Sequence, residues 1–214
     1  MAGWAEPPLH EYVLALTGKE RPRILWVPTA GMEDAASTLR FYDLFRDRAE
    51  LSHLHFFPWP PDDRRERALA SEVIWVGGGN TANMLAVWRV HGFDKVLREA
   101  WENGVLLTGW SAGAICWFEA GVTDSFGPQL EGMRDGLGFL PGSACPHYDG
   151  EELRRPRYAA LVREGFPAGI AIDDDVAVRF DGTELTEVVT SRDGARAYRV
   201  STAGEEPLEA RLIA

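Results

Sequence analysis

The stretch Gly104-Val-Leu-Leu-Thr-Gly-Trp-Ser-Ala-Gly113 joins a short apolar run to a serine between two glycines. The apolar run predicts a buried strand, and the small residues from Ala112 onward can begin a helix. The spacing fits the Gly-x-Ser-x-Gly turn, in which a sharp strand-to-helix reversal holds the serine hydroxyl clear of the strand end. The helix start also offers free N–H groups to developing negative charge. We therefore predict that Ser111 is a nucleophile, with a turn kept only for packing as the alternative.

Apolar runs alternate with amphipathic helical segments along the first two thirds of the chain. Strands are expected at 23–27, 51–57, 72–76 and 104–108, and shorter strands with turn signals between them at 169–172, 176–180, 184–190 and 195–200. Strands separated by helices indicate βαβ units and a parallel sheet with helices on both faces. We expect a single α/β domain over residues 1–214, a three-layer sandwich with a mostly parallel central sheet and an antiparallel C-terminal extension.

Composition excludes several classes of protein. The chain has 214 residues, of which 45% are hydrophobic, and its formal net charge is −11, which disfavours binding to a nucleic-acid backbone. No stretch approaches the roughly 18 apolar residues of a membrane helix. Met1–Pro8 lacks the basic region of a signal peptide, and two cysteines cannot form a disulfide framework. We expect a cytoplasmic protein with no membrane or nucleic-acid partner.

A nucleophilic serine needs a base, and His147 is the best placed of the five histidines. It lies in Cys145-Pro-His-Tyr-Asp149, downstream of Ser111, in the chain order that α/β-hydrolases use. His53 and His55 could form a metal-binding pair, but no further ligand cluster accompanies them. An acid must orient the imidazole, and the candidates between serine and histidine are Glu119, Asp124, Glu131 and Asp135. Asp124 is preferred because it follows the expected helix in a polar turn.

The segment Gly77-Gly-Gly-Asn-Thr81 closes another expected strand at the start of a helix. Consecutive glycines let backbone N–H groups approach a ligand closely. A phosphate-binding turn is one interpretation, although neither the Gly-x-Gly-x-x-Gly spacing nor a Walker lysine is present. We favour half of an oxyanion hole, with the N–H of Gly79 paired with that of Ala112, over a simple tight turn.

Two further features have plain alternatives. The run Asp173-Asp-Asp175 could bind a cation or a substrate ammonium group, but a solvated turn between strands is the simpler interpretation. Cys116 and Cys145 lie close in sequence to Ser111 and His147, and Cys145 could be a nucleophile. A reduced, packed thiol is the expected role of both.

Four strings together resemble the peptidase E (aspartyl dipeptidase) family of serine peptidases, to which cyanophycinases are more distantly related. They are Val76–Thr81, Gly109–Ala114, Thr123–Ser125 and Cys145–Tyr148, and the likeness extends from about Arg23 to Val200. The resemblance implies a fold like the class I glutamine amidotransferase domain, with serine in place of the cysteine. It also implies hydrolysis of short peptides without a cofactor or metal.

Carried over residue by residue, the resemblance implies a triad of Ser111, His147 and Asp124, with oxyanion donors on Gly79 and Ala112. Asn80, Arg154 and Arg157 are expected to contact the substrate. The segment between His147 and these arginines is shorter than in the aspartate-specific enzymes, so aspartate selectivity is not predicted. The sequence leaves open a homodimer, and a catalytically silent amidotransferase-like binding protein is the alternative function.

Overall fold

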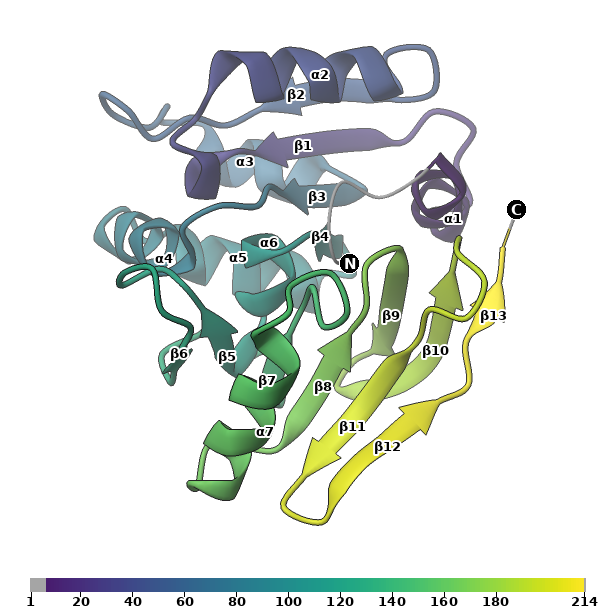
Figure 1. The fold of residues 1–214 in the computed structure, drawn as a ribbon. Coiled ribbons are helices and arrows are strands. Elements are labelled where there is room, and N and C mark those ends of the chain that lie inside the picture. The colour runs from purple at the N-terminus through teal and green to yellow at the C-terminus, as the bar shows by residue number, and fades with distance from the viewer. Residues whose placement is uncertain (1–6, 214) are drawn as a thin grey trace. The chain divides into compact units, whose positions relative to one another are not determined.

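Residues 7–213 are described by a computed structural model, in which the chain forms two compact units (Figure 1). One unit is Val13–Gly113, and the other comprises 7–12 together with 114–213 of the described residues. The segment examined for a signal peptide, Met1–Pro8, lies mostly outside the described residues. A single domain over 1–214 stays a prediction. The first helix, α1 (Pro7–Leu16), contributes residues to both units.

The unit of residues 13–113 is built on a four-stranded parallel sheet in the order β2-β1-β3-β4. Its strands are β1 (Arg23–Val27), β2 (Glu50–His53), β3 (Val73–Val76) and β4 (Leu106–Gly109). The connecting helices are α2 (Ala35–Phe45), α3 (Arg64–Ala70), α4 (Thr81–Val90) and α5 (Phe93–Glu102), with a 3-10 turn at Thr29–Gly31. All residues of β1 and β3 except Arg23 are buried. This is typical of parallel strands that are covered on both faces, and it explains why their sequences are continuous apolar runs.

Aromatic side chains hold α2 against this sheet. Trp26 and Trp75 are register partners on β1 and β3, so both point to the same face. Phe41 of α2 stacks on Trp26 with ring centroids 4.3 Å apart and meets the edge of Trp75 at 5.8 Å. Trp110, which follows β4, lies 5.3 Å from Trp26 and 5.7 Å from Trp75. We call Trp26, Phe41, Phe45, Trp75 and Trp110 the aromatic cluster.

The other unit contains a six-stranded mixed sheet in the order β12-β11-β8-β7-β5-β6. Its strands are β5 (Phe118–Thr123), β6 (Glu131–Met133), β7 (Leu140–Cys145), β8 (Gly169–Ile172), β11 (Ala197–Ser201) and β12 (Gly204–Leu208). β5, β7 and β8 are parallel, whereas β6, β11 and β12 pair antiparallel. A second, three-stranded sheet has the order β13-β10-β9 and contains β9 (Val176–Asp181), β10 (Glu184–Thr190) and β13 (Arg211–Leu212).

Helix α7 (Arg154–Arg163) supplies part of the core of this unit. Its Tyr158 and Val162 are buried in a cluster with Val122, Cys145 and other residues of the sheet. The Tyr158 hydroxyl also lies 2.6 Å from the Ser143 hydroxyl on β7. The α/β fold class, with mostly parallel strands and an antiparallel C-terminal part, is thus confirmed.

One expected element is shorter than predicted. The helix that begins after Ser111, α6, covers only Ala112–Ile115, and β5 begins three residues later at Phe118. Glu119 therefore lies on a strand and not on a helix, and its carboxylate accepts a hydrogen bond from the N–H of Gly142 at 2.9 Å. Trp117 and Phe118, where the chain enters β5, are both buried.

An ion pair across the start of the parallel sheet predicts a pH dependence of stability. Arg23 on β1 donates to both carboxylate oxygens of Glu72, and the N–H of Arg23 also donates to Glu72 at 2.7 Å. These contacts lower the pKa of Glu72 from 4.5 to about 2. A carboxyl whose pKa is depressed by folding stabilises the protein above its unfolded pKa, and this contribution is lost as pH falls through the folded pKa.

We expect Glu72→Gln to lower the free energy of unfolding at pH 7 by about 1 kcal/mol, since Arg23 is half exposed and solvent screens the pair. The deficit should shrink below about pH 4.5 and vanish near pH 2. Urea unfolding of the variant and the parent protein across this pH range measures it. A deficit that does not change with pH would contradict the assigned cause.

Candidate active site

Ser111 occupies a strained turn at the carboxyl end of β4. Its φ is 53°, a left-handed value that is uncommon for a residue with a side chain. The turn is closed by a hydrogen bond from the N–H of Gly113 to the carbonyl of Trp110 at 2.9 Å. The serine side chain is half-buried, while Ala112 behind it is buried. Strain of this kind persists where surrounding structure enforces it and is concentrated at functional sites.

The two glycines of the turn are required by close backbone contacts. A Cβ on Gly109 would lie 2.5 Å from the carbonyl oxygen of Val76, and one on Gly113 would lie 2.3 Å from the same atom. Trp110 fixes the turn from the other side, because its ring is buried in the aromatic cluster. The predicted strand–turn–helix at Ser111 is therefore present.

The glycine-rich segment at 77–79 lies directly beside this serine. A Cβ on Gly78 would lie 3.1 Å from the Cβ of Ser111. Gly79 has φ of 134°, and a Cβ there would be 2.1 Å from the carbonyl oxygen of Ala30, so glycine is required. Asn80 caps α4 by accepting a hydrogen bond from the N–H of Asn83 at 2.8 Å. The geometry is compatible with an oxyanion hole, but the donor roles of Gly79 and Ala112 and a substrate contact by Asn80 stay predictions.

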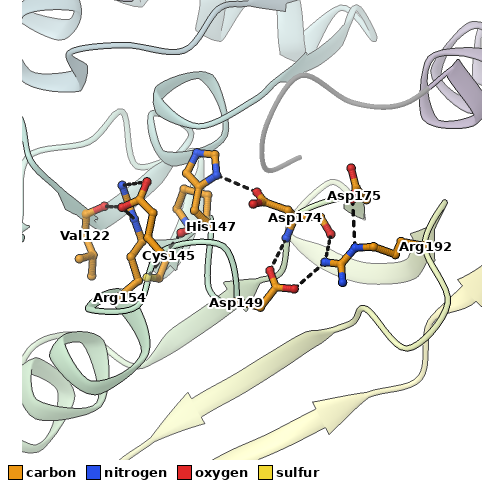
Figure 2. A network of polar contacts seen from close by, with 10 residues as sticks. Val122, Cys145, His147, Asp149, Arg154, Asp174, Asp175 and Arg192 are labelled. Carbon is orange, nitrogen blue, oxygen red and sulfur yellow. Dashed lines mark hydrogen bonds and ion pairs between the residues drawn. The ribbon is translucent and has the colours of Figure 1, made fainter.

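His147 lies just beyond the carboxyl end of β7, also with a left-handed φ, of 57°. Its Nδ1 is 2.7 Å from Oδ1 of Asp174, as Figure 2 shows. This hydrogen bond is the largest cause of the lowered pKa of Asp174. An ionised carboxylate can only accept, so Nδ1 carries the proton and Nε2 is left as the acceptor in the neutral ring. His147 thus has the tautomer of a general base.

The acid beside the histidine differs from the one that the sequence favoured. Asp124 lies in the exposed loop between β5 and β6, and the hydrogen bond expected of it is made by Asp174. Asp174 follows β8, which pairs parallel with β7 in a register that joins Cys145 to Ala171. The carboxyl ends of the two strands therefore lie side by side. Predicting this parallel pair from the sequence would have placed Asp174 beside His147.

The interpretation of Asp173–Asp175 as a solvated turn is wrong for Asp173. Asp173 is buried and accepts a hydrogen bond from the N–H of Arg196 at 3.0 Å. Its burial raises the pKa of its carboxyl group. Asp174 is partly exposed and engaged with His147. The turn is part of the histidine site.

The two arginines expected to contact substrate already have partners within the protein. Arg154 is buried, forms an ion pair with Glu151 at 2.7 Å and donates to the carbonyl oxygen of Val122 at 3.1 Å. Arg157 is half-exposed and donates to the carbonyl oxygen of Leu130 at 2.9 Å. These contacts give both side chains structural roles, and a substrate contact stays a prediction.

The alternative sites are not supported by the side chains involved. Neither cysteine is in a disulfide and both are buried, and burial raises the pKa of Cys145 to about 12, which disfavours a thiolate nucleophile. The rings of His53 and His55 lie 4.7 Å apart. Among residues 7–213, no group of three or more His, Cys, Asp or Glu side chains is arranged to hold a metal ion.

No helix in this range is long and apolar enough to cross a membrane.

A serine in a strained glycine turn and a histidine hydrogen bonded to a carboxylate are each typical of serine hydrolases. Comparison with known proteins agrees. The sequence matches the model of Peptidase family S51 over residues 4–188. It is 48% identical to the "Uncharacterized peptidase YgaJ" of Bacillus subtilis (strain 168), over 94% of this chain and 87% of that protein.

Solved structures show the same fold. A peptidase from an acI-B1 Actinobacterium superposes with a TM-score of 0.70 at 22% identity, over 98% of this chain and 91% of that chain. A putative peptidase E protein from Listeria monocytogenes EGD-e gives 0.63 at 19% identity, over 82% and 90%. The chain belongs to peptidase family S51, the peptidase E family, and is a serine peptidase. The resemblance found in the sequence is confirmed.

The close packing at the turn predicts a specific cost of enlarging it. We expect Gly113→Ala to lower the free energy of unfolding by about 3 kcal/mol, because the new Cβ would overlap the backbone of Val76. Gly104→Ala is a matched control in the same unit, because a Cβ at Gly104 would meet open space. Only the left-handed φ of 83° opposes alanine there, so we expect a loss of about 1 kcal/mol. Urea unfolding measures the free energy of unfolding of both variants. Equal losses would contradict the prediction, because they would show that the backbone around Gly113 shifts to accept the Cβ.

Proposed function

We propose that the protein is a serine exopeptidase that hydrolyses short peptides of the dipeptide type through Ser111, His147 and Asp174. The observation that carries the proposal is the hydrogen bond between His147 Nδ1 and Asp174, which leaves Nε2 as a base. The strained turn at Ser111 and membership of family S51 support it. Asp174 takes the place of Asp124 in the proposed triad because it is the carboxylate that meets the histidine.

In the proposed mechanism, Nε2 of His147 takes the proton from the Ser111 hydroxyl as its oxygen attacks the peptide carbonyl. Asp174 keeps the ring in its tautomer and stabilises the imidazolium that forms. The imidazolium then gives its proton to the leaving amine, and water hydrolyses the acyl-enzyme by the same route. N–H groups of Gly79 and Ala112 stabilise the oxyanion, each worth about 3 kcal/mol of the barrier.

The substrate is proposed to be a short peptide without a strict requirement for aspartate. Arg154, one of the two arginines that could read an acidic side chain, is buried and bonded to Glu151 and to the backbone of Val122. Releasing it for a substrate carboxylate would leave these partners unsatisfied, at a cost of about 1–3 kcal/mol. Action in the cytoplasm stays a prediction.

Ser111→Ala tests the nucleophile. We expect hydrolysis of Asp-Leu, Ala-Leu and Leu-Asp to be lost, with labelling by a fluorophosphonate probe lost in parallel. Alanine keeps the Cβ and removes only the hydroxyl, so the melting temperature should stay close to that of the parent protein. Turnover retained by a clean preparation of the variant, or a parent protein that neither labels nor hydrolyses any of the dipeptides, would refute the proposal.

The identity of the acid is tested by a pair of isosteric variants. We expect Asp174→Asn to lower kcat by about 10³-fold or more, because the amide can favour the wrong imidazole tautomer. Asp124→Asn should stay within about twofold, as a substitution at an exposed loop residue does. Steady-state kinetics on one dipeptide decides the question, and the reverse result would return the role to Asp124.

A further inference from the structure

The side chain of Arg192 is hydrogen bonded to the turn that carries the proposed catalytic acid. Its Nη2 donates to the backbone carbonyl of Asp174 at 3.0 Å and to Oδ2 of Asp149 at 2.5 Å. Its Nε donates to Oδ2 of Asp175 at 3.0 Å. One planar guanidinium thus binds three acceptors around Asp174 without touching the carboxylate that meets His147 (Figure 2).

Asp149 binds the other backbone group of the same residue, Asp174. Its Oδ1 accepts the backbone N–H of Asp174 at 2.8 Å, while its Oδ2 is bound by Arg192. Both the N–H and the carbonyl of Asp174 are therefore held by side chains. Asp149 also lies only two residues after His147, so the bridge connects the loop that carries the base to the turn that carries the acid.

The turn needs such a restraint for two physical reasons. Asp175 has a φ of 64°, a left-handed conformation that costs about 1–2 kcal/mol for a residue with a Cβ. Three consecutive aspartates and Asp149 also gather negative charge, which opposes the folded turn. The charge of Arg192 is among the causes that lower the pKa of Asp174 and keep its carboxylate ionised.

We propose that Arg192 is a positioning residue of the proposed triad. It acts through Asp149 and the backbone of Asp174 to hold the carboxylate at hydrogen-bonding distance from His147 Nδ1. The effect of this positioning on catalysis rests on the proposed function. Its effect on the hydrogen bond between His147 and Asp174 does not. Lysine cannot replace it fully, because one ammonium does not present donors on two edges of a rigid plane.

The kinetic test compares Arg192→Ala with Arg211→Ala. Arg211 is the matched control: it is an exposed arginine of the same unit and donates in the same way to a half-buried carboxylate, that of Glu187. We expect Arg192→Ala to lower kcat by about 10- to 100-fold with KM within twofold, since small misplacements of catalytic groups have effects of this size. The kcat of Arg192→Lys should lie between those of the parent protein and Arg192→Ala, and the kcat of Arg211→Ala should stay within twofold of the parent value.

A double-mutant cycle asks whether Arg192 acts through Asp174. In the Asp174→Asn background, Arg192→Ala should have no further effect on kcat, because the group that it positions is already disabled. Equal fold losses in both backgrounds would overturn the proposal and make Arg192 a general structural residue. So would a loss that appears only as a raised KM.

A proton NMR measurement keeps the inference separate from the proposed activity. The Nδ1 proton of His147, hydrogen bonded to Asp174, should give a downfield resonance in the parent protein that is absent from His147→Gln. We expect it to be lost or broadened in Arg192→Ala and kept in Arg211→Ala, with both variants folded by circular dichroism. A resonance unchanged in Arg192→Ala refutes the positioning role, whereas failure of the parent protein to hydrolyse peptides refutes only the proposed function.

Discussion

The approach of two glycines to one carbonyl oxygen is the constraint on which the turn at Ser111 depends. The oxygen of Val76, at the end of β3, lies so close to Gly109 and Gly113 that neither position can carry a Cβ. With no side chains between them, β3, β4 and the start of α6 come together, and the chain must reverse within the residues that join them. Ser111 takes its left-handed backbone as a result. Strain at the serine is therefore balanced by packing of its neighbours, including Trp110 in the aromatic cluster.

The histidine site is built on a different principle, the pairing of two parallel strands. β7 and β8 end side by side, so the residues that follow them face one another at a common edge. His147 extends β7 and Asp174 extends β8, and each lies in or beside a left-handed turn that aims its side chain. A strand pair brings distant residues together, but it does not orient them. Around Asp174, the backbone is held by hydrogen bonds from Arg192 and to Asp149, which are charged side chains from two other parts of the chain.

These two principles explain what the sequence could and could not predict. The turn at Ser111 is local: an apolar strand, two glycines and a helix start are contiguous, so the strand–turn–helix could be predicted from the sequence. His147 was found from chain order and from likeness to a family. Asp174 was not, because its contact with His147, 27 residues away along the chain, follows from the pairing of β7 with β8. Arg154 was expected to contact the substrate, yet it is buried and donates to the carbonyl oxygen of Val122 on β5, a contact between distant parts of the chain that the sequence pattern does not show.

The buried thiol next to the histidine has a practical consequence. Burial raises the pKa of Cys145 to about 12, so its thiol stays protonated at neutral pH and is shielded from reagents in solution. Alkylating agents and mild oxidants that inactivate cysteine-dependent hydrolases should therefore leave this protein's chemistry intact.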